Sequence, residues 1–133
     1  MSLNQPDVKP TDAELSILRV LWNQGSSTVR QVLDELNQVR PTGYTTVLKL
    51  LQIMTEKRLV DRDETNRTHV YRARYSETDT QHQLANDLLE KAFGGSRVQF
   101  FNALIDDKHL TREQFEILRQ EILELRQKEE NHA

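Results

Sequence analysis

Residues 41–59, with the sequence PTGYTTVLKLLQIMTEKRL, constrain the fold more than any other stretch of the chain. Val47, Leu50, Leu51 and Met54 recur there at spacings of three and four residues, which places one apolar stripe along a helix. Directly after this stretch the period of the apolar residues changes from that of a helix to that of a strand. The stretch is therefore predicted to be a helix that leads into β-strands.

The first turn of this predicted helix, residues 44–57, has a different character. It carries Tyr44, Thr45 and Thr46, with Lys49 one turn further on. A helix that is anchored at one end in a core, and that offers hydroxyls and a cation at the other, suits insertion into a groove of DNA. The alternative is an ordinary surface helix with threonines near its cap.

Two amphipathic helices are predicted before it. The first begins at a capping box, in which the Thr11 hydroxyl and the Glu14 carboxylate each accept a backbone N–H, and it ends at Gly25. The second begins at a similar box of Thr28 and Gln31. The residues expected on their buried faces are Leu15, Leu18, Leu21, Trp22, Val29, Val32, Leu33 and Leu36.

Two short strands, rich in β-branched and aromatic residues, are predicted at residues 59–63 and 68–75. Residues 64–67 between them have the composition of a turn, so the pair is expected to form a β-hairpin. The inward face of the second strand is expected to hold Tyr71, Ala73 and Tyr75, and the outward face Arg72 and Arg74.

Three helices followed by a two-stranded hairpin are the layout of a winged helix-turn-helix domain, which is predicted over residues 11–75 after a loose arm at residues 1–10. In this layout the third helix enters the major groove and the hairpin, or wing, lies along phosphates. Arg67 in the turn is the natural phosphate contact of the wing, and the alternative for it is a solvated turn residue. The residues expected to contact DNA are Arg30, Arg40, Thr42, Tyr44, Thr45, Thr46, Lys49 and Arg67.

Residues 76–133 are predicted to form a separate domain of three amphipathic helices, the last of which begins at a capping box of Thr111 and Gln114. A core this small rarely supplies more than about 3–5 kcal/mol on its own. We therefore expect a homodimer, which also suits a two-fold symmetric DNA site. The alternative is that the helices fold back on the first domain. The expected interface residues are Leu84, Leu88, Phe100, Phe101, Leu104, Phe115, Leu118, Ile122 and Leu125.

The charge of the chain is unevenly distributed. The net charge is −3, which is unfavourable for DNA binding. However, residues 41–75 carry seven basic against four acidic side chains, whereas residues 76–133 carry seven against twelve. The acidic part would repel phosphates, so it is expected to point away from DNA.

Other classes of function find little support in the sequence. The chain has no cysteine, which excludes disulfides, thiolate metal sites and cysteine nucleophiles. No apolar run is long enough to insert in a membrane and no signal peptide is visible, so a cytoplasmic protein is expected. Asp79, His82 and Asp87 can share a helix face, but a solvated polar face is the more ordinary interpretation than a metal site. We expect no enzymatic activity, no cofactor and no bound metal.

The segments TDAELSILRVLW, GYTTVLKLLQIMTEKRLV, HVYRA and LLEKAFGG resemble the penicillinase repressor family of BlaI, MecI and CopY type, over residues 8–127. The resemblance implies a homodimeric transcriptional repressor with an N-terminal winged-helix domain and a C-terminal three-helix dimerisation domain. Such repressors bind palindromic operators, and many of them control resistance to β-lactams. The resemblance assigns DNA contacts to Tyr44, Thr45, Thr46 and Lys49 of the recognition helix and to Arg67 of the wing.

The resemblance also implies a route of induction. In the β-lactam-responsive branch, a membrane-bound sensor with a metalloprotease domain triggers cleavage of an Asn-Phe bond in the second C-terminal helix. Aligned from Gly94 and Gly95, this chain has Asn102 followed by Ala103, which is the candidate cleavage bond although the Phe is not retained. The alternative is that Asn102 is an ordinary polar helix residue. The cysteine pairs of the copper-responsive branch are absent.

Two further alternatives concern the function as a whole. The first is a repressor that a small ligand or a metal ion releases from DNA. The second is a winged-helix module that binds another protein instead of DNA, which the net acidity of the chain permits.

Overall fold

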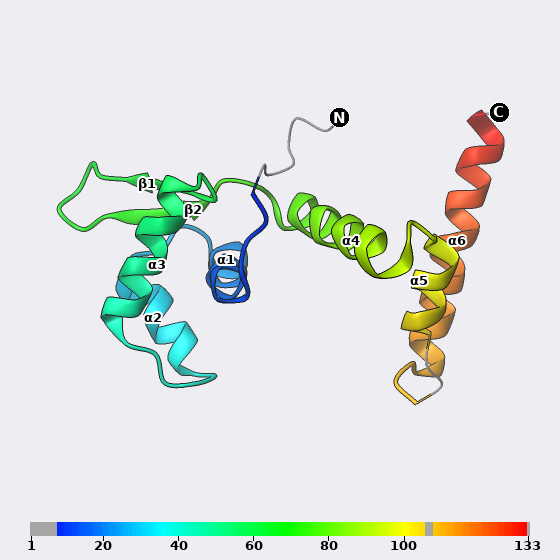
Figure 1. The fold of residues 1–133 in the computed structure, drawn as a ribbon, viewed down its shortest axis with the longest axis horizontal. Helices are drawn as coiled ribbons and strands as arrows, with labels where there is room; N and C mark the ends of the chain where they lie inside the picture. Colours follow the sequence, from blue (N-terminus) through cyan, green and yellow to red (C-terminus); the bar gives the residue numbers. More distant parts are fainter. Residues whose placement is uncertain (1–7, 106–107, 133) are drawn as a thin grey trace. The chain divides into compact units, whose positions relative to one another are not determined.

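The computed structural model describes residues 8–105 and 108–132 (Figure 1). The elements are α1 (Asp12–Gln24), α2 (Val29–Asn37), α3 (Tyr44–Glu56), β1 (Val60–Asp63), β2 (Val70–Ala73), α4 (Glu77–Phe93), α5 (Arg97–Leu104) and α6 (Arg112–His132). The predicted fold class, mainly helical with a small β-hairpin, is confirmed for these residues. The chain divides into two compact units after Asp87, inside α4.

Helices α1 and α2 of the first unit begin at the predicted capping residues. Thr11 Oγ1 accepts the N–H of Glu14 at 3.3 Å, and Glu14 Oε1 accepts the N–H of Thr11 at 2.9 Å. Thr28 and Gln31 repeat this arrangement at 3.2 and 2.9 Å. Helix α1 ends at Gly25, whose φ of 83° lies in the region that glycine adopts at little cost. The start of each of these helices is thus determined by residues within four positions of it.

One core joins α1, α2, α3 and the hairpin. On α3, the predicted stripe is confirmed, because Val47, Leu51 and Met54 are fully buried and Leu50 packs against the core from its edge. The other buried members of the core are Ile17, Leu18, Leu21, Val29, Val32, Leu33, Leu59, Val60 and Tyr71.

The buried face expected on α1 needs one correction. Ile17 is fully buried, whereas Leu15 and Trp22 are only half-buried. The indole of Trp22 lies at the margin of the core, because its Nε1–H donates a hydrogen bond to the backbone oxygen of Tyr75 at 3.0 Å. The helix therefore turns Ile17 toward the core, and Trp22 holds the chain where it leaves the hairpin.

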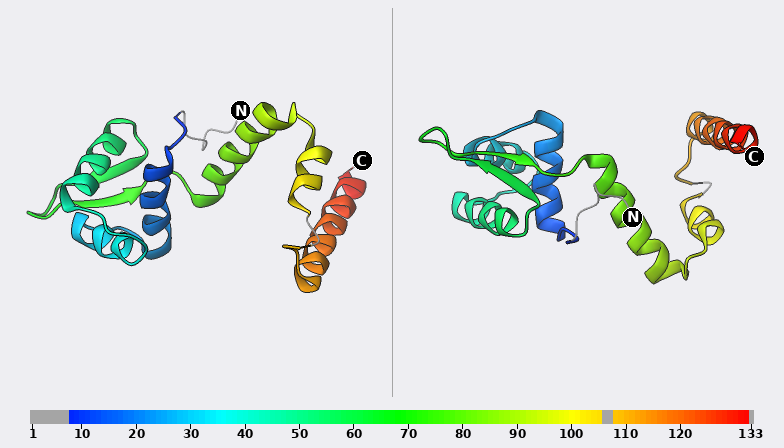
Figure 2. Two further views of the ribbon diagram at one scale, coloured as in Figure 1. Left: turned by 60° about the horizontal axis from the view of Figure 1, so that its bottom comes forward. Right: turned by 90° about the horizontal axis from the view of Figure 1, so that it is seen from above.

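The hairpin pairs Val60 with Ala73 and Asp63 with Val70 in an antiparallel register. Its strands are shorter than predicted, and residues 64–69 form the loop. We call residues 60–73 the wing, and Figure 2 shows its loop projecting away from the three helices of the first unit. Tyr71 is buried and Arg72 is exposed, as the alternation of the second strand predicted.

A small bridge joins the wing to the start of α2. The N–H of Ser27 donates to the oxygen of Tyr71 at 2.9 Å, and the N–H of Tyr71 donates to the oxygen of Ser27 at 2.8 Å. Ser27 itself is buried, and its hydroxyl donates to the backbone oxygen of Gly25 at 2.9 Å. Strand β2 is therefore held beside the residues that precede α2.

The second unit has little interior. Within its described residues Leu89 is buried, while α5 and α6 contain no buried residue. The rings of Phe93 and Phe100 contact each other with centroids 4.8 Å apart. The capping box predicted for α6 is confirmed, with Thr111 Oγ1 accepting the N–H of Gln114 at 3.1 Å. The helices of this unit have well-defined starts but no core of their own.

The arm expected at residues 1–10 lies mostly outside the described residues. Of its last part, Pro10 is buried, and the ammonium of Lys9 lies 2.8 Å from the carboxylate of Asp87 in α4. This ion pair is largely exposed to solvent, so it contributes little to stability.

Candidate nucleic-acid interface

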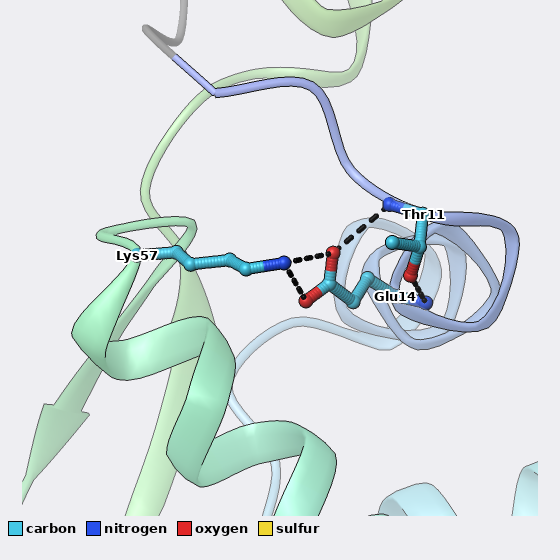
Figure 3. Close-up of polar contacts among 3 residues, drawn as sticks. All are labelled: Thr11, Glu14 and Lys57. Atoms are coloured by element: carbon cyan, nitrogen blue, oxygen red, sulfur yellow. Dashed lines mark hydrogen bonds and ion pairs between the residues drawn. The ribbon is translucent and has the colours of Figure 1, made fainter.

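The C-terminal end of α3 is tied to α1 by an ion pair (Figure 3). Lys57 Nζ lies 2.9 and 3.2 Å from the two carboxylate oxygens of Glu14, whose side chain is 2% exposed. Burial acts to raise the pKa of Glu14, but the hydrogen bond from the Thr11 N–H and the ammonium of Lys57 together lower that pKa below its ordinary value. Glu14 therefore stays charged at neutral pH and holds this end of α3 in place.

The N-terminal turn of α3 is instead open to solvent. Tyr44, Thr45, Thr46 and Lys49 are exposed, as their proposed contact with DNA requires. The N-cap is Gly43, so no side chain accepts the N–H groups of the first turn. Each of the other helices has a Ser or Thr whose hydroxyl accepts such an N–H. Exposed amides at the positive end of a helix dipole are well suited to contact a phosphate.

Arg30 from α2 joins this surface. Its guanidinium carbon lies over the ring of Tyr44, 5.7 Å from the ring centroid, which is within the range of a cation–π contact. Arg30 on α2 and Tyr44 on α3 were each expected to contact DNA, and the structure places their side chains side by side.

The turn between α2 and α3 contains Arg40 and Thr42. The N–H of Thr42 donates to the side-chain oxygen of Asn37 at 2.7 Å, and the Thr42 hydroxyl donates to the oxygen of Arg40 at 3.2 Å. Thr42 is half-buried and Arg40 is exposed. Thr42 therefore shapes the turn, while the Arg40 side chain is accessible from solvent.

The wing brings Arg67 to the same surface. Arg67, Arg30 and Tyr44 line a hollow of about 290 Å³ between the wing and the starts of α2 and α3, which we call the wing hollow. Thr68 and His69 also line it, and neither was among the residues expected to contact DNA. The two-residue alternation that placed Tyr71 inward extends back to His69, so a signal for His69 was present. Lys49 and Arg40 do not line this hollow.

Most of the residues expected at a dimer interface line one hollow or are exposed. Phe101, Phe115, Leu118 and Ile122 line an apolar hollow of about 210 Å³ between α5 and α6, which we call the α5–α6 hollow. The expected residues that are exposed are Leu88, Leu104, Phe115, Ile122 and Leu125, so Phe115 and Ile122 belong to both sets. The heptad spacing did not select Val98, Ile117 and Leu123, which are exposed as well. Leu84 and Phe100 are half-buried.

The candidate cleavage bond lies in α5, where Asn102 and Ala103 are both exposed. The last residue of α5 is Leu104, so the bond lies in the final turn of that helix. Final turns of helices fray readily, and a protease needs an extended substrate backbone.

The described part of the chain contains no group of three or more His, Cys, Asp or Glu side chains arranged to hold a metal ion. Asp87, which shares a helix with Asp79 and His82, is bonded to Lys9. Among the helices of residues 8–105 and 108–132, none is both long enough and apolar enough to cross a membrane.

Comparison with known proteins extends over both units. The family model described as penicillinase repressor matches residues 10–124. The penicillinase repressor of Bacillus licheniformis is 22% identical over 110 residues, which cover 83% of this chain and 86% of that protein.

Among solved structures, the DNA-binding domain of the repressor BlaI is 25% identical, with a TM-score of 0.48 over 59% of this chain and 93% of that one. The Bacillus licheniformis BlaI monomer in complex with the blaP half-operator is also 25% identical, with a TM-score of 0.47 over 54% of this chain and 88% of that one.

The family match begins just before α1 and ends inside α6, so it includes most of both units. The assignment rests on this match and not on the solved structures. The resemblance inferred from the sequence motifs is thereby confirmed. The chain belongs to the penicillinase repressor family, as a DNA-binding transcriptional repressor and not an enzyme.

Proposed function

We propose that this chain represses transcription as a homodimer on a two-fold symmetric DNA operator. The observation that carries the proposal is the division of α3 into a buried, ion-paired rear and an exposed, uncapped front. In each copy the front of α3 enters the major groove, where Tyr44, Thr45 and Thr46 contact base edges and the adjoining backbone. The buried rear keeps the orientation of this helix constant, which sequence-specific contact requires.

The cations around α3 supply the contacts to phosphate. The proposed phosphate contacts are Lys49, Arg30, Arg40 and Arg67, with Thr42 at the turn between α2 and α3. Such contacts fix the position of the protein on DNA and make its affinity fall with salt, but they carry no sequence information themselves. Selectivity among operators therefore rests on the first turn of α3.

The second unit, together with Leu84 near the end of the first, provides the dimer contact in this proposal. The exposed apolar residues of α6 support it, because Phe115, Ile122 and Leu125 are 49%, 48% and 65% exposed in a single copy. A second copy that covers them would remove this apolar surface from water. The proposed interface comprises Leu84, Leu88, Phe100, Phe101, Leu104, Phe115, Leu118, Ile122 and Leu125.

Release from DNA follows from loosening the dimer, since each copy makes half of the contacts. Cleavage of Asn102–Ala103 would cut α5, whose Phe101 lines the α5–α6 hollow. The protease in this scheme is a membrane-bound sensor with a metalloprotease domain that acts on the cytoplasmic repressor. Incubation of the full chain with that protease domain tests the scheme, because fragments that end at Asn102 support it and an intact chain contradicts it.

The central experiment is selection of duplexes from a random pool by the full-length chain. The selected sites are expected to be palindromic, with half-sites about one DNA turn apart. Sedimentation of the complex is expected to give two copies of the chain per duplex. Enrichment of no sequence, or one copy per selected duplex, contradicts the proposal.

A further inference from the structure

The wing hollow combines the features of a site for a single anion. We propose that it seats one phosphate of the DNA backbone, held by Arg30, Arg67 and His69 together. This inference rests on the proposed function and goes beyond it in two respects. It assigns the two arginines to the same phosphate, and it adds His69 as a third contact.

The lining of the hollow combines basic and polar side chains with the apolar Val29 and Leu48. Its ionisable residues are Arg30 from α2, Arg67 and His69 from the wing, and Tyr44 and Tyr71 from α3 and β2. No acidic side chain is among the described residues that line it. Guanidinium groups match the geometry of phosphate oxygens, and an imidazole N–H adds a further donor. The hollow therefore attracts an anion with several oxygen acceptors.

The opposite side of the wing has the opposite character. A second hollow there is lined by Asp61, Asp63 and Glu64 together with Arg62 and Arg72. The arginines on this side are already paired, since Arg72 Nε lies 3.8 Å from the carboxylate of Asp61 and Arg62 is bonded to Glu64. These carboxylates would repel a phosphate.

Asp63 remains charged on this acidic side. The hydroxyl and the N–H of Thr65 both donate hydrogen bonds to its carboxylate, the latter at 2.9 Å, and they lower the pKa of Asp63 below its ordinary value. A DNA strand that reaches the wing is therefore expected to lie on the side that faces α3.

The seat is organised before any ligand arrives. Arg30 lies over the ring of Tyr44, which limits the positions available to its guanidinium. The backbone bridge between Ser27 and Tyr71 holds β2 beside the start of α2, and this places His69 near Arg30 in the folded chain. A side chain that is already ordered loses less entropy on binding, so the position of Arg30 over Tyr44 strengthens its contact with a phosphate.

The most direct test neutralises one phosphate at a time. A duplex selected by the wild-type chain is prepared with an uncharged methylphosphonate at each backbone position in turn, and its affinity is measured for full-length wild type, Arg30→Ala and Arg67→Ala. At one position in each half-site the wild type is expected to lose about tenfold in affinity. Both variants should lose less than about threefold there, because the contact is already absent. If the Arg30 and Arg67 variants lose their sensitivity at different methylphosphonate positions, or at none, the two arginines do not contact the same phosphate.

Arg72→Ala is the matched control, because Arg72 lies on the acidic side of the wing. This variant is expected to respond to every methylphosphonate as the wild type does. If Arg72→Ala became insensitive to the methylphosphonate at one position, Arg72 would contact that phosphate, and DNA would then lie on the acidic side of the wing. Thermal unfolding followed by circular dichroism establishes that each variant is folded, which is expected since Arg30, Arg67 and Arg72 are all exposed.

His69 is tested at the same phosphate. Full-length His69→Asn should lose less than about threefold in affinity at the methylphosphonate that is coupled to Arg30 and Arg67, because one donor of that contact is already absent. A His69→Asn variant that loses about tenfold there, as the wild type does, would remove His69 from the site.

His82→Asn, at an exposed histidine of α4, is the matched control and should respond to every methylphosphonate as the wild type does. The outcomes also separate the two proposals. A wild-type chain that prefers no duplex contradicts the proposed function before any variant is compared. A wild-type chain that selects a duplex, with no phosphate coupled to both arginines, contradicts only the phosphate seat.

Discussion

The two compact units of this chain differ in what they bury. Among its described residues the first unit encloses twelve apolar side chains in one core, whereas α5 and α6 of the second bury none. Apolar residues are nevertheless abundant in the second unit, where Val98 and Leu104 are 71% and 64% exposed. The difference shows that a helical apolar pattern specifies a helix with an apolar face, but that it does not specify which surface covers that face.

The physical basis of the difference is the source of stabilisation. Burial of apolar surface contributes about 25 cal/mol per Å², and the first unit obtains it from its own chain. An isolated helix is marginal in water even when it has well-formed caps, so α6 needs a covering surface. If that surface is a second copy, the stability of the second unit depends on protein concentration and that of the first does not.

The largest effect is expected from Leu118→Asp, which tests the need for a covering surface. Leu118 lines the α5–α6 hollow, and an unpaired charge in a buried interface costs about 3–5 kcal/mol. Because both copies carry the change, the dimer should dissociate and DNA affinity should fall by more than about a hundredfold. Sedimentation measures the dissociation. A dimer that persists moves the interface elsewhere, and Gln120→Asp on the exposed side of α6 should leave it intact.

Met54→Ala tests the other half of the comparison, the self-contained core. Met54 is fully buried, and truncation of a buried methionine costs about 2–5 kcal/mol. Fluorescence of Trp22, the single tryptophan of the chain, reports unfolding of the first unit. The loss should be independent of protein concentration. A loss that varies with concentration would mean that the first unit also depends on a partner, and Gln52→Ala on the exposed face of α3 should have little effect.

Lys57→Met has a smaller effect that depends on pH. In the wild type, the lowered pKa of Glu14 stabilises the folded state at pH values above the ordinary pKa of a glutamate. This contribution is lost as the pH falls through the pKa of Glu14 in the folded state. Without Lys57 the buried carboxylate keeps its hydrogen bonds with Thr11 but has lost its ammonium partner, so its pKa is higher in the variant than in the wild type. The variant should be about 1–2 kcal/mol less stable at pH 7, and the difference should shrink toward pH 4.

Trp22 fluorescence during urea unfolding measures this difference at each pH. Lys9→Met is the control, because it removes a more exposed ion pair in the same unit and should cost less than about 0.5 kcal/mol at either pH. A constant difference between pH 4 and 7 would show that Lys57 acts through packing and not through the charge of Glu14.

The smallest effect is expected from Lys49→Ala, which compares the cations of the two units. Loss of one phosphate contact should weaken binding to all duplexes alike and lower the salt slope by about one per chain. Lys128→Ala, in the acidic second unit, should change neither. A change of sequence preference in Lys49→Ala would make Lys49 a base contact, and an unchanged slope would remove it from the interface.

Much of this fold could be predicted because its signals are local. The starts of α1, α2 and α6 follow from capping boxes whose partners are three residues apart. The stripe of α3 follows from its spacing, and the wing from a change of period. The failure on α1 has an equally clear cause, since Leu15 and Ile17 are similar in type and only the neighbouring elements decide which of them is covered.

The contacts that organise the site could not be predicted in this way. Glu14 and Lys57 lie 43 residues apart, and each has an ordinary role in its own helix as a capping or terminal residue. Arg30 and His69 line the same hollow because Ser27 pairs with Tyr71, and nothing in either segment specifies that pairing. Interactions between distant segments depend on how whole elements pack, which no short pattern encodes.

The sequence by itself determined the order and limits of most elements, the family, and the part of α3 that is proposed to contact DNA. These features follow from hydrogen bonds and apolar spacings among residues that are close in sequence. Such local interactions form without contacts from the rest of the fold. Only the tertiary structure decided which cations share a hollow, which side of the wing is acidic, and that the apolar faces of α5 and α6 are open in a single chain. These depend on long-range packing, because burial and electrostatic potential are properties of the assembled surface.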